Sequence, residues 1–255
     1  MMEHYVRKSD QLYSSDYEIK VRDEWAKAFE ECPIPSTHML QNLGLFLNSK
    51  NLSRILFLNH IYKLILDVPG IVIEFGTRWG NCMSLFSALR GIYESYHRHR
   101  KIVGFDTFTG FPEVGTKDNE ECPMMHAGGL ACTENYVEYL ERIMCFQEDD
   151  NPLSHIKKFE IRAGDACVEI DRYFKEYPES IVALAFFDFD IYEPTKRCLE
   201  AIKGRLVKGS VLAFDELNDH DSPGETLALD EIFGLNNIKL KRFPITTRLA
   251  YFIVE

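Results

Sequence analysis

The sequence lacks the features that mark membrane, secreted and zinc-binding proteins. None of its apolar stretches approaches the roughly 20 residues that cross a bilayer. The N-terminal segment, MMEHYVRKSDQLY, has no apolar core of the kind that a signal peptide carries. The seven cysteines are odd in number and include no C-x-x-C pair. These absences favour reduced thiols in a cytoplasmic protein, and they argue against a disulfide framework, a thiolate zinc site and a membrane partner.

Positive charge is scarce as well. Lysine and arginine together number 29, against 40 aspartates and glutamates, which gives a formal net charge of −11 at pH 7. No run rich in lysine or arginine interrupts this acidic balance. Because binding to a phosphate backbone depends on clustered positive charge, the composition argues against a nucleic-acid partner.

The length and one strong break predict how the chain is organised. A chain of 255 residues suits one large α/β domain with an extension. Pro69-Gly70 interrupts the chain just before the first strand pattern. We therefore expect an N-terminal helical extension over residues 1–67 and the main domain over residues 68–255. Helix patterns in the extension lie at about residues 17–31, 36–47 and 52–66. The extension would pack on the sheet, cover the active site or build a homo-oligomer, and the sequence leaves these roles open.

The strongest pattern in the chain is a buried strand that ends in acid. Residues 181–187, IVALAFF, form a continuous apolar run, typical of parallel strands that are buried on both faces. Asp188 and Asp190 follow it. Residues 192–203 then have a helix pattern, and residues 211–214 form a second short apolar strand. A helix between two buried strands predicts a right-handed parallel crossover.

The second strand also ends in acid, at Asp215 and Glu216. Because both strands are parallel, the two acidic pairs lie at the same carboxyl edge of the sheet, where open α/β sheets bind ligands. Four carboxylates in one place repel one another unless a cation or hydrogen-bond donors compensate them. Oxygen ligands without histidine or cysteine suit a hard cation such as Mg²⁺, Mn²⁺ or Ca²⁺. The alternative is that the acids line loops or cap helices, as Asp190 could.

A second motif has the order strand, glycine turn, helix. Residues 71–75, IVIEF, form a short apolar strand that runs into GTRWGN, and a helix pattern follows. Gly76 and Gly80 permit close approach of a ligand, and the helix N-terminus would present backbone amides to it. The turn lacks the third glycine of a dinucleotide-binding fingerprint, which argues against a nicotinamide cofactor. The next strand, residues 101–105, ends in Asp106, which could accept hydrogen bonds from a ribose diol or initiate a turn.

Two further segments each allow two interpretations. Residues 107–132 form a long loop with several glycines, which indicates a lid or binding loop. The histidine in this loop, His126, could act as a base or substrate contact, or could simply be solvated. Asp165 follows Gly164 after a strand pattern at residues 159–162. Its carboxylate could contact an adenine amino group or cap the next helix.

Taken in chain order, these motifs resemble those of class I S-adenosylmethionine-dependent methyltransferases. Within that class the chain looks like the macrocin O-methyltransferase (TylF/MycF-like) family of sugar O-methyltransferases. The resemblance covers about residues 68–255, and its central and Phe-Gly-Phe-Pro motifs are its most specific parts. The matching residues are Glu74, Gly76, Gly80, Asp106, Phe108, Gly110, Phe111, Pro112, Asp188, Asp190, Tyr192, Thr195, Asp215 and Glu216.

The resemblance implies a fold, a cofactor and a metal. The fold is α/β, a Rossmann-like, doubly wound seven-stranded sheet whose last strand is antiparallel. S-adenosylmethionine would lie over the first strands. Its binding residues would be Glu74, Gly76, Thr77, Gly80, Asp106, Thr107, Phe108, Gly164 and Asp165. A divalent ion, Mg²⁺ or Mn²⁺, would hold two sugar hydroxyls and be bound by Asp188, Asp215 and Glu216. Many relatives have two aspartates at the last pair, so Glu216 is a departure.

The general base stays open within this resemblance. Some metal-dependent methyltransferases have a lysine or histidine three residues after the first metal-binding aspartate. This chain has Ile191 there, which cannot accept a proton. The remaining candidates are Asp188, His126, His220 and a metal-bound water. His220 lies in a short acidic loop, DHD, which could be a ligand set or a solvated loop.

These observations predict an S-adenosylmethionine-dependent, metal-dependent O-methyltransferase that acts on a sugar hydroxyl. The sugar would be nucleotide-linked or a glycoside, in surface-polysaccharide or natural-product biosynthesis. One alternative is a methyltransferase for another small polar acceptor, such as a catechol or a phosphorus-containing acid. A second is a methyltransferase-like module that binds without catalysis, although the intact acids and glycine turn argue against it. The sequence leaves the sugar, its hydroxyl and the oligomeric state undetermined.

Overall fold

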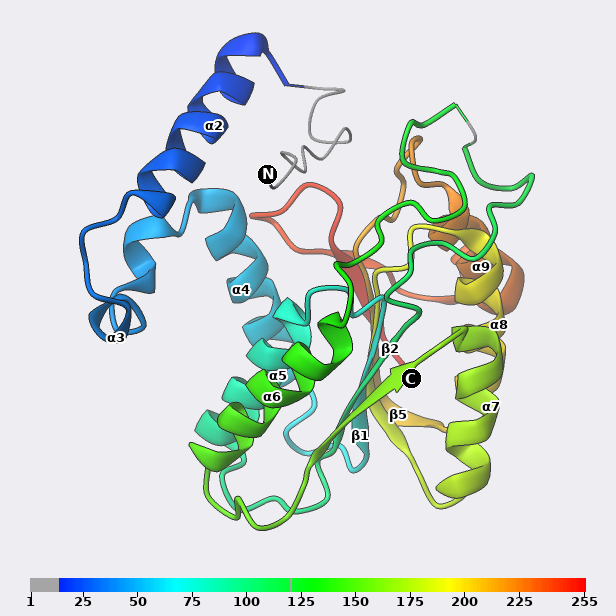
Figure 1. Ribbon diagram of the computed structural model, residues 1–255. Coiled ribbons are helices and arrows are strands. Elements are labelled where there is room, and N and C mark those ends of the chain that lie inside the picture. The colour runs from blue at the N-terminus through cyan, green and yellow to red at the C-terminus, as the bar shows by residue number, and fades with distance from the viewer. Residues whose placement is uncertain (1–13, 120) are drawn as a thin grey trace.

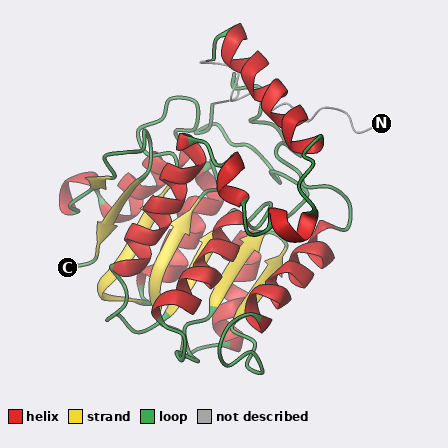
Figure 2. Ribbon diagram, turned by 90° about the vertical axis from the view of Figure 1, so that its left-hand side faces the viewer, coloured by secondary structure: helices red, strands yellow, loops and turns green. Residues whose placement is uncertain are grey.

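A seven-stranded sheet with helices on both faces forms the centre of the structure (Figures 1 and 2). The computed structural model describes residues 14–119 and 121–255. The strands are β1 (Ile71–Phe75), β2 (Ile102–Asp106), β3 (Phe159–Ala163), β4 (Val182–Phe187), β5 (Leu206–Phe214), β6 (Lys241–Arg242) and β7 (Ala250–Ile253). The helices are α2 (Asp16–Glu30), α3 (Ser36–Met39), η1 (Leu43–Phe46), α4 (Ser49–Lys63), α5 (Asn81–Tyr93), α6 (Tyr136–Asp149), α7 (Ala166–Glu176), α8 (Tyr192–Lys203), α9 (Gly224–Phe233) and η2 (Leu235–Asn237).

The strand order is β3-β2-β1-β4-β5-β7-β6. β1 to β5 are parallel, and β7 runs antiparallel to both β5 and β6. The chain winds outward from β1 to β3 and then returns to place β4 on the other side of β1. The winding therefore reverses between β1 and β4, which is the position where doubly wound sheets bind ligands. The predicted Rossmann-like seven-stranded sheet with an antiparallel last strand is confirmed.

The strand side chains alternate between two cores. In β1, Ile71, Ile73 and Phe75 pack with residues of α7, α8 and α9, whereas Val72 packs with residues of α4, α5 and α6. Figure 1 shows these two helix groups on opposite faces of the sheet. Each fully buried large apolar side chain contributes about 1.5–3 kcal/mol through removal from water. Burial on both faces explains why β1 and β4 are continuous apolar runs rather than alternating ones.

The N-terminal helices divide into an exposed part and a packed part. No described residue from 14 to 56 is buried, whereas Phe57, Leu58, Ile61 and Tyr62 of α4 pack against the same sheet face as α5. α2 and α3 stand apart from the sheet (Figure 1). The expected single helix over residues 36–47 is wrong, because α3 ends at Met39 and a separate 3-10 turn, η1, follows. The domain boundary between residues 67 and 68 stays a prediction.

One further boundary differs from the expected one. β5 starts at Leu206 rather than near residue 211, because Gly209, with φ of 93°, lies inside the strand. α6 starts at Tyr136, directly after Asn135, whose backbone is in the left-handed region. Within the described ranges, the chain forms no helix with the length and hydropathy of a membrane span.

Candidate active site

The ends of β1, β4 and β5 align the two predicted acidic pairs. Phe75 is in register with Phe187, and Phe187 is in register with Phe214. Two more hydrogen bonds continue these ladders, from the Asp188 N–H to the Phe75 carbonyl at 2.8 Å and from the Asp215 N–H to the Phe187 carbonyl at 3.0 Å. Asp188 and Asp215 therefore lie side by side at the carboxyl edge.

Three of the four acids form one group of oxygen ligands. Asp188, Asp215 and Glu216 each offer one carboxylate oxygen, and these oxygens lie within 4.8 Å of one another. Their side chains are 25%, 11% and 4% exposed. Asp190 lies outside this group and has a left-handed backbone, with φ of 64°. Three carboxylates with no nitrogen or sulfur ligand fit a hard cation such as Mg²⁺ or Mn²⁺.

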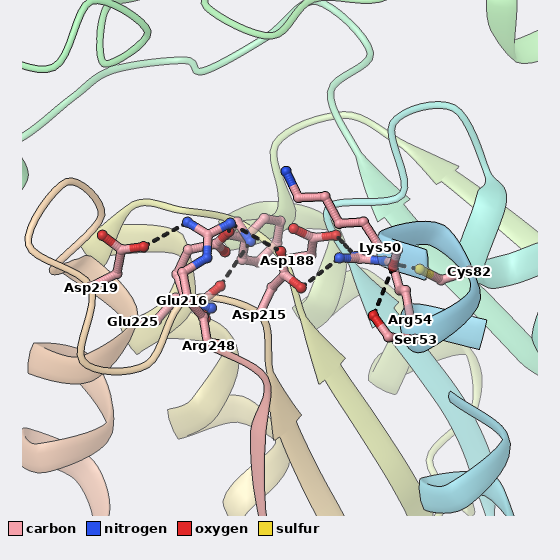
Figure 3. Close-up of polar contacts among 11 residues, drawn as sticks. Lys50, Ser53, Arg54, Cys82, Asp188, Asp215, Glu216, Asp219, Glu225 and Arg248 are labelled. Carbon is pink, nitrogen blue, oxygen red and sulfur yellow. Dashed lines mark hydrogen bonds and ion pairs between the residues drawn. The ribbon is translucent and has the colours of Figure 1, made fainter. Parts of the chain in front are cut away.

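Arg54, from the second turn of α4, reaches into this group. Its guanidinium forms an ion pair with Asp188, and it donates to Asp215 Oδ1 at 2.5 Å and to Cys82 Sγ at 3.5 Å (Figure 3). The sequence pattern did not indicate Arg54, because 134 residues separate it from Asp188 and 161 from Asp215. The contact depends on the packing of α4 against the sheet, for which its local sequence carries no signal.

A second arginine compensates the other side of the group. Arg248, just before β7, donates to Glu216 Oε1 at 2.9 Å and to Asp219 Oδ2 at 2.6 Å (Figure 3). Its Nη2 also lies 4.0 Å from Asp215 Oδ2. The sequence pattern did not indicate Arg248 either. The repulsion among the carboxylates is therefore met in this structure by two cationic side chains of the chain itself, one from each end of the sequence.

The pKa values of Asp215 and Glu216 are shifted in opposite directions. Burial raises the pKa of Asp215, but attraction to Arg54, a hydrogen bond with Glu216 and attraction to Arg248 together outweigh burial and hold the pKa below its ordinary value. Burial and then the negative charge of Asp215 raise the pKa of Glu216 well above its ordinary value. Oε2 of Glu216 is buried and has no hydrogen-bond partner among the described residues. The group thus contains an unpaired buried ligand atom, which is what a cation site would use.

Glu225, which follows Gly224 at the start of α9, holds the backbone of both strand ends. Its fully buried carboxylate accepts the Phe189 N–H at 3.1 Å and the Glu216 N–H at 3.2 Å. Burial, followed by the charges of Asp190, Asp188 and Asp215, raises its pKa well above the ordinary glutamate value.

The glycine turn lies directly beside the acidic group. A Cβ on Gly76, with φ of 90°, would come within 2.0 Å of the Asp188 carbonyl oxygen, so only glycine fits there. Gly80, also at positive φ, directly precedes α5, and in the described part of the chain no side chain caps that helix. The first amides of α5 are therefore suited to an anionic group of a ligand.

Two buried oxygens of the turn region have no hydrogen-bond partner among residues 14–119 and 121–255. They are Glu74 Oε2, in β1, and Thr77 Oγ1. Burial and the nearby Asp188 raise the pKa of Glu74 well above its ordinary value. A Cβ on Gly104 would meet Thr77 Oγ1 at 2.5 Å, so Thr77 packs inward on β2.

Asp106, at the end of β2, joins the glycine turn to the long loop. Its Oδ2 accepts the Arg78 N–H at 2.7 Å, and its Oδ1 accepts the Phe108 N–H at 2.6 Å. The Thr107 hydroxyl donates to the Gly110 carbonyl at 2.6 Å, which closes the turn after the strand. Each carboxylate oxygen has two acceptor positions, so these bonds leave acceptor capacity for a diol.

Gly164 and Asp165 complete the carboxyl edge beyond Asp106. The Gly164 N–H donates to the Asp106 carbonyl at 2.9 Å. The exposed Asp165 caps α7, because its Oδ1 accepts the Cys167 N–H at 2.9 Å. The capping alternative is thus present in the structure, and the adenine contact stays a prediction.

The structure places both candidate histidines on exposed loops. The His126 ring contacts the Ala127 carbonyl at 2.9 Å, and the His220 side chain is 93% exposed with Asp221 Oδ1 3.9 Å away. Within the described ranges, neither histidine contacts the three carboxylates. Their roles as bases stay predictions.

The long loop is anchored over the start of α8. Asp118 Oδ1 accepts the Tyr192 N–H at 2.8 Å, and its Oδ2 accepts the Gly115 N–H at 2.9 Å. Ile191 packs with the buried loop residues Cys122 and Met125. Ile191, at the position where a basic residue would follow the first metal-binding aspartate, therefore serves here as an apolar anchor for the loop.

The fold matches solved methyltransferase structures. The crystal structure of CalS11, a calicheamicin methyltransferase, is 38% identical to this chain with a TM-score of 0.91, over 95% of this chain and 94% of that chain. This chain belongs to the class I S-adenosylmethionine-dependent O-methyltransferases of the TylF/MycF type. The resemblance seen in the sequence is confirmed, and the chain is an O-methyltransferase.

Two other solved structures are similar to this chain. The apo structure of CalS11, a TDP-rhamnose 3'-O-methyltransferase, is 35% identical with a TM-score of 0.83, over 95% of this chain and 96% of that chain. The O-methyltransferase NovP, at 18% identity and a TM-score of 0.58 over 79% of each chain, shares the fold. No protein-family model matches the chain. No curated protein matches it.

Proposed function

We propose that this O-methyltransferase methylates a hydroxyl of a nucleotide-linked sugar and that it requires a divalent metal ion. The observation that carries the proposal is the oxygen-only group of Asp188, Asp215 and Glu216 beside the glycine turn. This arrangement supports an acceptor site next to a cofactor site. The CalS11 relative named as a TDP-rhamnose 3'-O-methyltransferase, 35% identical over 95% of this chain, supports a nucleotide-linked sugar as the acceptor.

The cofactor would occupy the edge formed by β1, β2 and β3, where it supplies an electrophilic methyl group on sulfur. The amides at the start of α5 would bind its carboxylate, Asp106 would accept from its ribose, and Asp165 would accept from its adenine amino group. The full set of proposed cofactor residues is Glu74, Gly76, Thr77, Gly80, Asp106, Thr107, Phe108, Gly164 and Asp165.

The reaction requires that the acceptor hydroxyl lose its proton. A sugar hydroxyl is barely ionised at neutral pH, so it must lose its proton as it attacks the methyl carbon. A metal held by Asp188, Asp215 and Glu216 would lower the pKa of the hydroxyl and orient the diol. Holding the oxygen in line with the methyl group adds several kcal/mol by positioning alone.

We assign to Asp188 the role of accepting the proton that the sugar hydroxyl loses. Its side chain is 25% exposed and lies at the junction of the acidic group and the glycine turn, whereas His126 and His220 lie on exposed loops. Arg248 would keep Glu216 oriented through its 2.9 Å ion pair, because Arg248 is itself held by Asp219.

A panel of acceptors tests this proposal. The full chain is incubated with S-adenosylmethionine, Mg²⁺ and, in parallel, a nucleotide-linked deoxyhexose, the same sugar as a simple glycoside, and a catechol. Mass spectrometry then measures methylated product. We expect methylation of the nucleotide-linked sugar at the highest rate. Faster methylation of the catechol would contradict the sugar assignment. Binding of S-adenosylhomocysteine without methylation of any acceptor in the panel would contradict the proposed reaction.

A further inference from the structure

Arg54 holds the place where a cation would bridge two of the proposed metal ligands. Its guanidinium contacts the Asp188 carboxylate and Asp215 Oδ1, the latter at 2.5 Å (Figure 3). Both aspartates belong to the group of three ligand oxygens that lie within 4.8 Å of one another. A divalent ion bound to the two aspartates would sit against the guanidinium, and the like charges would repel without water between them.

We propose that Arg54 is a displaceable internal cation: a metal ion binds to Asp188 and Asp215 in exchange for its guanidinium. Arg54 thereby sets the metal affinity of the enzyme. This inference rests on the metal site of the proposed function. In the metal-free protein the guanidinium neutralises the aspartates, and in the loaded protein the metal takes over that role.

The second arginine of the site shows why the exchange involves Arg54. Arg248 bonds to Asp219 at 2.6 Å, a carboxylate outside the group of three, and can stay in place when Glu216 turns to a metal. Arg54, in contrast, places its guanidinium on two carboxylates that both belong to the group. The two arginines are therefore not equivalent, although each pairs with Asp215 or lies close to it.

The position of Arg54 in α4 allows its side chain to move away from Asp188 and Asp215. Arg54 lies in the N-terminal half of α4, where residues 49–56 are exposed or half-buried and the Arg54 side chain is 26% exposed, whereas the half of α4 from Phe57 onward is packed on the sheet. Helix turns without buried side chains open at a lower free-energy cost than packed turns. Metal loading would thus be coupled to the position of the exposed N-terminal helices, which lie on the same stretch of chain (Figure 1).

Metal titration of Arg54 variants tests the exchange. The full chain with bound S-adenosylhomocysteine is titrated with Mn²⁺, and free Mn²⁺ is measured by electron paramagnetic resonance. In the unmodified chain, Mn²⁺ can bind only to the fraction of molecules in which Arg54 has left the aspartates, so the apparent Mn²⁺ affinity is reduced by that fraction. Arg54→Met removes this competition and should bind Mn²⁺ about tenfold or more tightly than the unmodified chain. Arg54→Lys keeps the charge but loses the forked geometry, so its affinity should lie between the two.

The matched control is Arg172→Met. Arg172 on α7 has a side chain that is 64% exposed and pairs with the mostly buried Glu169, so its removal changes the net charge equally at another place. Its Mn²⁺ affinity should equal that of the unmodified chain. Equal or weaker binding by both Arg54 variants would overturn the exchange while leaving the metal site intact. Absence of Mn²⁺ binding in every protein would overturn the exchange and the metal requirement together.

Hydrogen exchange supplies a second readout that does not depend on affinity. Mn²⁺ should speed amide exchange over residues 49–56 of the unmodified chain, because Arg54 no longer ties these turns to the sheet edge. In Arg54→Met these amides should exchange fast from the outset and not respond to Mn²⁺. Slower exchange in the unmodified chain on metal addition would contradict the exchange of cations.

Discussion

Glu225 holds Glu216 by its backbone: the Glu216 N–H donates to Glu225 Oε2 over 3.2 Å. The same carboxylate accepts the Phe189 N–H at 3.1 Å with its other oxygen. One buried side chain thus fixes the chain immediately beside two proposed metal ligands, Asp188 and Glu216. The relationship ties the geometry of the site to the stability of the fold, and it gives a prediction about pH.

Glu225→Gln should alter the pH dependence of stability. Burial raises the folded-state pKa of Glu225, so the unmodified chain loses stability as pH rises from the ordinary glutamate value through the raised pKa. The variant cannot ionise, so it lacks this loss, which amounts to at most about 1.4 kcal/mol per pH unit. At pH 5 the variant should be less stable by about 1–3 kcal/mol, because its amide satisfies only one N–H. Its deficit should then shrink toward pH 8.

Urea unfolding from pH 5 to pH 8 measures this difference, with Glu231→Gln as the control. The exposed Glu231 bonds to Lys196, Tyr192 and Lys117, which lower its pKa to about 2. Its stabilising effect is therefore constant over that pH range and is lost only at lower pH. If the stability of Glu225→Gln and that of the unmodified chain change in parallel with pH, burial does not raise the pKa of Glu225.

Asp106→Asn should weaken binding of S-adenosylhomocysteine. The amide keeps the shape of the side chain and one acceptor oxygen, but it loses the charge-assisted hydrogen bonds to the ribose that we propose, worth about 1.5–3 kcal/mol. Calorimetric titration should show an affinity lower by about tenfold or more. Asp171→Asn, which removes a carboxylate paired with Arg197 at the surface of α7, is the control and should bind normally. An unchanged affinity in Asp106→Asn would remove Asp106 from the cofactor site.

Asp118→Ala should release the long loop. The carboxylate bonds the loop to the Tyr192 N–H at the start of α8 and also accepts the Gly115 N–H. Loss of such a helix cap costs about 1 kcal/mol. We expect hydrogen exchange in residues 107–119 to slow when cofactor product and acceptor bind to the unmodified chain, and to stay fast in the variant. Asp118→Asn, which keeps one acceptor oxygen, should lie between them. Identical exchange in the unmodified chain with and without both ligands would make this segment an ordinary loop.

The sequence predicted the features that depend on periodicity and chain order. Apolar runs, a helix between them and the acids that follow them were enough to predict the parallel sheet and to bring Asp188 and Asp215 to one edge. The packed partners could not be predicted in this way. Arg54 reaches the site only because α4 docks on the sheet, and the long-range contact leaves no local pattern. The role of Asp165 could not be predicted either, because a helix cap and a ligand contact both use an aspartate at this position.

The metal requirement is tested most directly by removal and return of the ion. The enzyme is stripped with a chelator and assayed with S-adenosylmethionine and a nucleotide-linked deoxyhexose, before and after addition of Mg²⁺ or Mn²⁺. We expect chelation to abolish methylation, either ion to restore it, and affinity for S-adenosylhomocysteine to stay nearly unchanged, because the metal touches the acceptor. Asp188→Asn should lose more activity than Glu216→Gln, since we propose that Asp188 also takes the proton. Full methylation in the presence of chelator would contradict the metal site and leave the three carboxylates to their arginine partners.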